Sequence, residues 1–521
     1  MKTNARFTYS HVNFEQDKDV HLVVDLSAPK IDWQAKRPAV CIIPVIDVSG
    51  SMGGAKLDYA KLSVLKLIDH LQPGDFCGLV TFESSVQTIS PPMEMTQTKK
   101  DELKIKVGNL VPLGCTDFSG GLLEALTHAN KADLPTGMLI RVVMFTDGQA
   151  NRGVATTSKD LIQLLDQNIG HATVSAFGYG QDANQDLLAD FAKAGKGNYA
   201  FVKNPDDALS AFAKELGGLL STYAQNIRVD VRPHAGHTIE EVISDVDSTG
   251  DKSGVLVKIP DILSEEVRHL IFAVKIGKQP NTFPRATSVI DVKVEYECLD
   301  EKGQRTSHTE ELKGKLKFVK PGEEDKEPIK DVMELVGTGI LVQKQLEAEE
   351  LAKRGDYHGA QGVMRGVGTV LDSFMLHDHV VASNAIGAKM TNAPMYAASS
   401  GYLKSMAVGG TRSVGVSSYD PEAEGVLKGL KISTSTAAQN AAVQSFVDVG
   451  DMSPAVAQQA IADVKAVYQP TVNTVGTTGV VATGSGGVIV TPNTGVNGIG
   501  GASVTPSESP KSVTKSKSKR W

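Results

Sequence analysis

The sequence predicts an α/β fold in which a doubly wound, mostly parallel sheet is inserted in or next to an antiparallel β-sandwich and is followed by a helical hairpin and a flexible C-terminal tail. Three patterns support this prediction. Between residues 39 and 220, short apolar runs alternate with amphipathic helical segments, which is typical of a parallel sheet covered by helices on both faces. After residue 224, apolar residues alternate at period two, as in Ile290, Val292, Val294 and Tyr296. After residue 328 the apolar spacing becomes helical.

The doubly wound domain is expected to span residues 38–223. Its first strand is a continuous apolar run, which indicates burial on both faces of the sheet. A Gln72-Pro73-Gly74 breaker ends the first helix. The expected strands are Ala39–Asp47, Phe76–Phe82, Leu139–Thr146, Ala172–Gly178 and Asn198–Val202, and the expected helices are Lys56–Leu71, Gln97–Leu110, Ser119–Asn130, Lys159–Ile169, Gln185–Ala194 and Asp206–Tyr223.

Other segments flank this domain. Residues 1–37 contain the strand-like run His21–Leu26, which we expect to pair with a β-sandwich over residues 224–322, so that the first domain is an insertion. A helical hairpin is expected over 328–385, then a mixed, partly helical region over 386–468 with helices within Val443–Val467. Residues 469–521 are rich in Gly, Thr, Val, Ser and Pro and predict a flexible tail with a basic end. The sandwich strands are expected at Asn226–Arg232, Gly254–Pro260, His269–Lys275, Ser288–Cys298 and Leu312–Phe318, and the hairpin helices at Pro328–Leu351 and Tyr357–Leu371.

Composition narrows the class of protein. A chain of 521 residues with 41% hydrophobic and 22% charged residues is typical of soluble globular proteins with more than one folded unit. A net charge of -7 argues against nucleic acid as the partner of the whole chain. No window approaches the roughly 18–20 apolar residues of a membrane helix. Because no secretory signal is recognisable and the four cysteines form no CxxC pair, we expect a cytoplasmic protein with reduced cysteines (Cys41, Cys77, Cys115 and Cys298).

Three short motifs carry the chemistry. The first strand ends in Asp47-Val48-Ser49-Gly50-Ser51, Thr116-Asp117 opens a helix, and Thr146-Asp147-Gly148 ends a later strand. Because ligands bind at the carboxyl ends of strands in such sheets, we expect these motifs to meet at one edge. Carboxylate and hydroxyl oxygens are hard donors that suit Mg²⁺, Mn²⁺ or Ca²⁺. The simpler alternative is that these groups only cap helices and loops.

These motifs, in this order, closely resemble those of the von Willebrand factor A family over residues 38–223 and match its metal-ion-dependent adhesion site. The resemblance implies that Ser49 and Ser51 coordinate a metal directly, and that Asp47 and Asp147 hold it directly or through water. It also implies that Thr116 joins when ligand binds and that one coordination position stays open for an Asp or Glu of a partner protein. We therefore expect an adhesion or adaptor protein that binds through Mg²⁺, and not an enzyme.

The layout around this domain is similar to that of bacterial A-domain proteins labelled calcium-activated-channel-like and of plant A-domain ubiquitin ligases. The matching stretches are Phe177–Gly180, Pro205–Ala208, Glu215–Leu220, Gly401–Ser405 and Ser417–Tyr419. The sequence has no RING-type CxxC or His cluster, so the resemblance does not imply ligase activity.

Two other functions stay open: an accessory subunit that presents substrate to an ATPase or other enzyme complex, and a structural component of a large assembly. The sequence does not determine the oligomeric state. His377-Asp378-His379 could bind a transition metal, but we interpret it as a solvated helix end, because adjacent spacing on a helix turns the two imidazoles apart. Lys515, Lys517, Lys519 and Arg520 are interpreted as a solubilising end rather than a nuclear-import signal.

Overall fold

The computed structural model describes residues 1–30, 39–131, 134–135, 138–180, 182–202, 213–214, 217–218, 221–279, 285–299, 305–412, 421–432, 435–436, 439–441 and 443–444. Several expected segments lie outside these residues. They are most of the helix Asp206–Tyr223, nearly all of Val443–Val467, the stretches Pro205–Ala208 and Ser417–Tyr419, and the whole tail 469–521 with its basic end.

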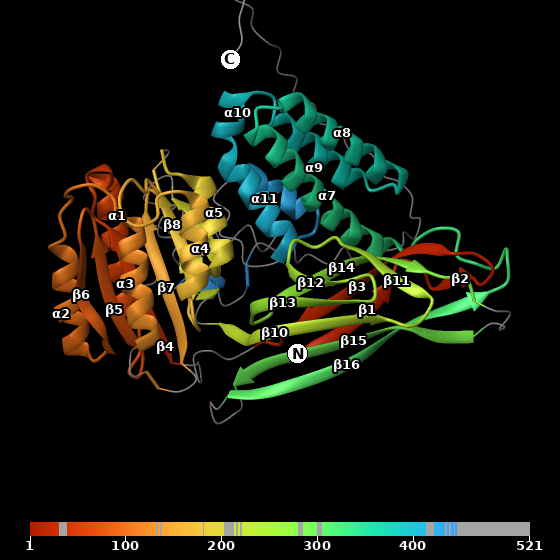
Figure 1. The fold of residues 1–521 in the computed structure, drawn as a ribbon, viewed down its shortest axis with the longest axis horizontal. Coiled ribbons are helices and arrows are strands. Elements are labelled where there is room, and N and C mark those ends of the chain that lie inside the picture. Colours follow the sequence, from red (N-terminus) through yellow and green to blue (C-terminus); the bar gives the residue numbers. More distant parts are fainter. Residues whose placement is uncertain are drawn as a thin grey trace, which may run out of the picture. The chain divides into compact units, whose positions relative to one another are not determined.

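A six-stranded sheet forms the first part of the fold, in the order β6-β5-β4-β7-β8-β9 (Figure 1). Strands β5, β4, β7, β8 and β9 run parallel to one another, and β6 lies antiparallel to β5 at the edge. The predicted α/β fold with a mostly parallel sheet is therefore confirmed. We predicted no strand at β6, which contains Pro91 and Pro92. An edge strand tolerates proline, since one of its sides needs no ladder hydrogen bonds. The strands are β4 (Val40–Asp47), β5 (Phe76–Phe82), β6 (Val86–Glu94), β7 (Leu139–Thr146), β8 (Thr173–Tyr179) and β9 (Lys196–Val202).

Helices cover both faces of this sheet. Strand β4 is buried along its whole length, and its alternate side chains enter two different cores. Ile42 packs in the core that contains helices α1 and α2, and Ile43 packs in the core that contains α3, α4 and α5. The short turn η1 (Gly50–Met52) leads into α1 (Ala55–His70), and the other helices are α2 (Gln97–Gly108), α3 (Phe118–Lys131), α4 (Ser158–Asn168) and α5 (Gln185–Ala194).

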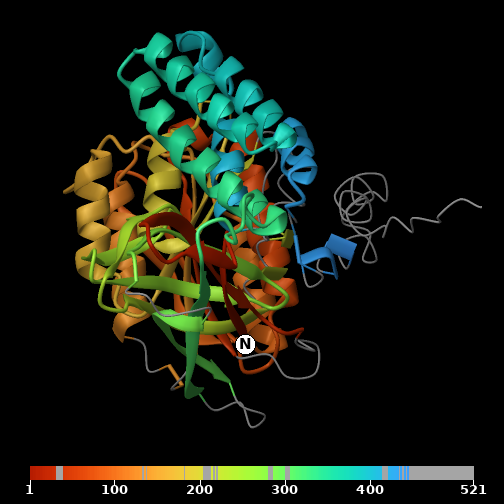
Figure 2. The same ribbon diagram turned by 90° about the vertical axis from the view of Figure 1, so that its right-hand side faces the viewer.

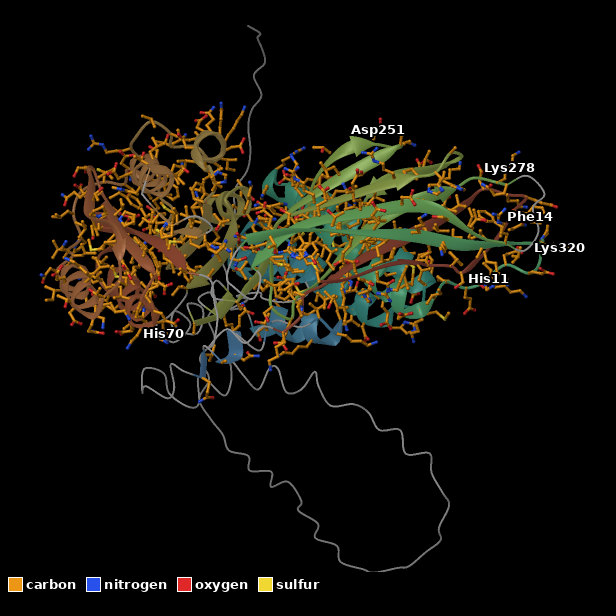
Figure 3. All side chains as sticks on the ribbon, turned by 90° about the horizontal axis from the view of Figure 1, so that it is seen from below. His11, Phe14, His70, Asp251, Lys278 and Lys320 are labelled. Carbon is orange, nitrogen blue, oxygen red and sulfur yellow. The ribbon has the colours of Figure 1, made fainter. Side chains whose placement is uncertain are left out.

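A β-sandwich is built from strands on both sides of the sheet domain in the sequence. One sheet has the order β1-β3-β14-β11 and the other the order β12-β13-β10-β15-β16-β2. Strand β3 pairs antiparallel with β14, which joins the N-terminal segment to the strands that follow the sheet domain. Figure 3 labels His11, Phe14, Lys278 and Lys320 at one end of this sandwich. The first sheet contains β1 (Lys2–Phe7), β3 (Lys18–Ser27), β11 (His237–Val242) and β14 (Val267–Ile276), and the second contains β2 (His11–Asn13), β10 (Thr222–Pro233), β12 (Asp247–Asp251), β13 (Gly254–Leu263), β15 (Arg285–Leu299) and β16 (Arg305–Val319).

At the end of the sheet domain the type of element differs from the sequence prediction. Thr222 and Tyr223 were expected to end a helix, but they begin strand β10. The two residues are β-branched and aromatic, a composition that favours strands. Thr222 is paired with Leu263 of β13, so the antiparallel ladder of the sandwich determines their conformation.

The C-terminal helices form a group that lies together in both ribbon views (Figures 1 and 2). They share an apolar core with Val23 of β3 and Ile271 of β14, whereas the neighbouring residues Val24 and Phe272 face the sandwich core. No helix in the described part of the chain is long and apolar enough to cross a membrane. The helices are α7 (Lys330–Lys353), α8 (Tyr357–Ser373), α9 (His377–Ala388), α10 (Ala393–Ala398), α11 (Ser400–Arg412) and α12 (Pro421–Gly429).

The interpretation of His377-Asp378-His379 as a solvated helix end is wrong for one residue. His377 is exposed, but His379 is buried, with its Nε2 atom 3.0 Å from the Thr338 hydroxyl and 3.0 Å from the Glu334 carbonyl. The sequence does not show that α7 lies against this face of α9, so the burial of His379 could not be anticipated.

Candidate metal site

Three loops meet at the carboxyl edge of the six-stranded sheet. One follows β4, one leads into α3 and one follows β7. Backbone hydrogen bonds join the first two, because the Leu113 amide donates to the Val48 carbonyl at 2.6 Å and the Gly50 amide donates to the Gly114 carbonyl at 3.1 Å. The predicted motifs therefore lie at one edge of the sheet, as the strand order requires.

The strand-end motif folds onto itself. The Ser49 amide donates to Asp47 Oδ1 at 2.9 Å, and the Ser49 and Ser51 hydroxyls are 3.1 Å apart. The Thr146 hydroxyl donates to the other Asp47 oxygen at 2.6 Å. Asp47 and Ser49 are buried, whereas Ser51 is exposed. The motif thus presents a row of oxygen atoms that runs from a buried carboxylate out to solvent.

Thr116 is buried and is held by the loop that follows β7. Its amide donates to Asn151 Oδ1 at 2.9 Å, and its carbonyl accepts from the amides of Asn151 and Arg152 at 3.3 and 3.1 Å. These backbone contacts connect the Thr116 segment to the segment that carries Asp147.

Asp147 is fully buried and forms an ion pair with Lys56, a residue that we did not assign to the site from the sequence. The ammonium group of Lys56, in the first turn of α1, lies 3.1 Å from Asp147 Oδ2 and 2.7 Å from Asp182 Oδ2. A lysine in the first turn opposes the helix dipole, which favours acidic residues there. A lysine at this unfavourable position is the sequence signal that could have indicated an acidic partner for Lys56.

The electrostatics of the edge favour a cation. Burial, with a smaller contribution from the nearby charge of Asp147, raises the pKa of Asp47 to about 6 against the opposing hydrogen bonds from Ser49 and Thr146. Burial alone would lower the pKa of Lys56, but its hydrogen bonds to Asp182 and Asp147 raise it. Two buried carboxylates in close proximity are unfavourable unless a positive charge compensates them.

The donor set fits a hard divalent cation. Within the described residues, no group of three or more Asp, Glu, His or Cys side chains is placed to share a metal ion. Hydroxyl oxygens must therefore complete any coordination at this edge. Two carboxylates with two serine hydroxyls and one threonine hydroxyl suit Mg²⁺, Mn²⁺ or Ca²⁺ better than a metal that prefers thiolate or imidazole ligands.

Comparison with known proteins identifies the class of this domain. Residues 41–201 match the family model described as von Willebrand factor type A domain, so this part of the chain is such a domain. Domains of this type commonly mediate protein–protein interactions.

Two curated relatives match about a third of this chain. Inter-alpha-trypsin inhibitor heavy chain H1 of Sus scrofa is 30% identical over 195 residues, which are 36% of this chain and 21% of that protein. Heavy chain H3 of Homo sapiens is 28% identical over 205 residues, with 36% and 22% coverage. The chain therefore spans about a fifth of the length of these relatives.

Two solved structures share more of the fold. A von Willebrand factor type A protein from Catenulispora acidiphila gives a TM-score of 0.56 at 16% identity, and the match covers 73% of this chain and 88% of that one. The ArnB paralog VWA2 from Sulfolobus acidocaldarius gives a TM-score of 0.50 at 16% identity, with 78% and 96% coverage. The likeness therefore extends beyond residues 41–201, and at these identities it concerns the fold alone.

Proposed function

We propose that this chain is an adhesion or adaptor protein whose sheet edge holds Mg²⁺, or alternatively Mn²⁺ or Ca²⁺, and binds an exposed Asp or Glu of a partner protein. The metal ligands are Asp47, Ser49, Ser51, Thr116 and Asp147. The observation that carries this proposal is the hydrogen-bonded Asp47–Ser49–Ser51 group, which lies at the carboxyl edge of the sheet and reaches solvent at Ser51.

The charge balance explains why such a site binds an acid. A divalent cation held by two carboxylates and neutral hydroxyls has no excess of negative ligands around it, so it retains a strong attraction for a further carboxylate. Lys56 already pairs with Asp147, which reduces the negative charge available to the cation. A partner carboxylate bound there can dominate an interface in the way a hot-spot residue does.

We propose binding rather than catalysis because both carboxylates of the site are engaged. Asp47 accepts hydrogen bonds from Ser49 and Thr146, and Asp147 pairs with Lys56. The Thr146 hydroxyl that donates to Asp47 is fully buried and therefore not accessible as a nucleophile. Substrate presentation to an enzyme complex, or a structural role in an assembly, would use the same site and would differ only in the partner that is bound.

The test begins with metal binding by the full chain. Isothermal titration calorimetry with Mg²⁺ should show one site, and the double substitution Ser49→Ala with Ser51→Ala should abolish it. Ser85→Ala is the matched control, because Ser85 is exposed near the same edge and its hydroxyl bonds to Glu83. An unchanged Mg²⁺ affinity in the double variant would disprove the site.

Partner binding is tested with the same proteins. Immobilised wild-type chain should retain a partner in Mg²⁺ and release it in EDTA, whereas the double serine variant should not retain it. Identification of the released protein separates an enzyme complex from a scaffold or a structural assembly. A partner that stays bound in EDTA would contradict the metal-dependent mechanism.

A further inference from the structure

Three large apolar side chains lie exposed on the two loops that surround the candidate metal site. Val111 and Leu113 are each 58% exposed, and Val154 is 77% exposed. They make up a third of the nine strongly exposed large hydrophobic residues in the described part of the chain. Single exposed apolar residues are ordinary, but several around one polar site indicate an interaction surface. We call Val111, Leu113 and Val154 the apolar rim.

Hydrogen bonds place the rim beside the site. The amide of Leu113 donates to the carbonyl of Val48, which lies between Asp47 and Ser49 in the strand-end motif. On the other side, the amide of Val154 donates at 3.0 Å to the hydroxyl of Ser119, in the first turn of α3. Since Thr116 lies between these two attachments, the rim flanks it from two loops.

Charged groups at the same edge are arranged so that an acid can approach. Asp182 is paired with Lys56, and the carboxylate of Glu83 accepts hydrogen bonds from Ser84 and Ser85. Arg152 is exposed in the same loop as Val154 and adds a positive charge. The acids beside the site are therefore engaged, and the rim presents apolar surface together with an exposed cation.

We propose that the apolar rim selects a loop of a partner protein in which the acidic residue is accompanied, within two positions, by an apolar side chain such as Leu, Ile, Val or Phe. This inference rests on the proposed metal-dependent binding. Apolar contacts on the rim remove surface from water on both partners, so they add affinity that the carboxylate alone does not provide. In an extended segment, residues two positions apart lie on the same side, about 7 Å from each other, which allows one to reach the site and the other the rim.

A peptide library provides a probe that does not require the natural partner. Disulfide-closed peptides with seven random positions, displayed on phage, are selected on the immobilised full-length chain in Mg²⁺ and eluted with EDTA. The expected consensus is one Asp or Glu with an apolar residue within two positions. The best peptide is then synthesised together with its Asp→Asn or Glu→Gln form and a form in which the apolar residue is Ser.

Variants of the chain show whether the rim contributes. Leu113→Ser and Val154→Ser should each weaken binding of the best peptide about tenfold, which is the effect of removing one apolar contact. Their Mg²⁺ affinity should stay unchanged. Val370→Ser is the matched control, since Val370 is 46% exposed on α8 in the helical part of the chain, and it should leave both affinities unchanged.

The outcomes separate the two proposals. Acidic peptides that elute with EDTA but lack apolar neighbours, or that bind the rim variants with wild-type affinity, overturn the rim proposal and leave the metal-dependent function intact. Peptides that show no dependence on Mg²⁺ overturn both. A full-length chain that dimerises in Mg²⁺ through Leu113, seen as a dimer lost in Leu113→Ser, overturns the assignment of the rim to a foreign partner.

Discussion

Arg141 on β7 donates a 2.7 Å hydrogen bond to Asp261 on β13, and both side chains are buried. This ion pair joins the sheet domain to the sandwich. Arg412 at the end of α11 reaches the same carboxylate at 3.3 Å, so the C-terminal helices are attached at this point as well. Asp147 lies six residues after Arg141, at the opposite end of β7, which is about 20 Å away at strand spacing. The junction therefore leaves the candidate metal edge free.

Removal of Arg141 should destabilise the fold strongly. Burial would raise the pKa of Asp261, but Arg141, Arg412 and Arg268 together hold it below its ordinary value, so the carboxylate stays charged. Arg141→Met leaves a buried carboxylate with less compensation, which typically costs about 3–5 kcal/mol. Chemical denaturation monitored by circular dichroism measures the change in the free energy of unfolding.

An exposed ion pair is the control for this prediction. Lys99 and Glu102 are one turn apart on α2, and both are largely exposed. Lys99→Met should leave the midpoint of denaturation unchanged, because solvent screens such pairs. Equal effects of Lys99→Met and Arg141→Met would show that the junction contributes no special stability.

Lys56 should weaken metal binding, because its ammonium group lies 3.1 Å from a carboxylate oxygen of Asp147. Lys56→Met removes a positive charge that repels a divalent cation and that competes for this oxygen. A change on the order of 1 kcal/mol is reasonable for a partly exposed charge, so the Mg²⁺ affinity should rise about three- to tenfold. Calorimetry at low and high salt measures the gain, which should shrink as salt screens the charge.

Lys61→Met on the same helix provides the comparison. The Lys61 ammonium donates to the Gly108 carbonyl at 3.2 Å and does not contact a residue of the proposed site. Its Mg²⁺ affinity should equal that of the wild type. A lower affinity in Lys56→Met would mean that the lysine mainly positions Asp147, which is the opposite role.

The sequence predicts the sheet domain well because its signals are local. The fully apolar run of β4 indicates burial on both faces, and breakers such as Pro73 mark the ends of helices. Strand β6 was missed because its pairing depends on the neighbouring strand β5 and its two prolines argue against a strand. Likewise, Thr222 belongs to β10 because of its pairing with Leu263, a contact that no local pattern reveals.

The candidate site also combines features that the sequence predicts with features that depend on contacts between distant residues. Asp47, Ser49 and Ser51 lie close together in the sequence, so the strand-end motif could be recognised and its internal hydrogen bonds follow. The ion pair between Lys56 and Asp147 depends on how α1 lies against the end of β7, 91 residues away along the chain. The apolar rim depends on exposure, which the residues Val111, Leu113 and Val154 do not show by their type alone.

His379 should make the fold sensitive to acid. Burial lowers its pKa below the ordinary value of 6.5, although the Glu334 carbonyl and nearby acids oppose the shift. As the pH falls below 6.5, the unfolded chain takes up a proton on this imidazole before the folded chain does, so stability decreases. Above 6.5 the stability contributed by the neutral imidazole is fully present. His379→Gln should therefore lose less stability than the wild type between pH 7 and pH 5, as measured by thermal unfolding.

The exposed neighbour His377 tests whether the effect depends on burial. His377→Gln should retain the wild-type pH dependence, because the side chain is 78% exposed. Burial also lowers the pKa of His21 and His237, so part of the acid sensitivity should persist in His379→Gln. Identical pH profiles for wild type and His379→Gln would contradict the proposed linkage.

Two helical glycines should respond to alanine in opposite directions. A Cβ atom on Gly121 of α3 would lie 2.5 Å from the buried ring of Phe82, so the helix packs against β5 only because a side chain is missing there. Gly121→Ala should cost about 1–3 kcal/mol through overpacking. A Cβ atom on Gly366 of α8 would meet nothing within 4 Å, so Gly366→Ala should gain about 0.5–1 kcal/mol from helix propensity. Urea denaturation of both variants measures the difference, and a stabilising Gly121→Ala would show that α3 can move away from Phe82 at little cost.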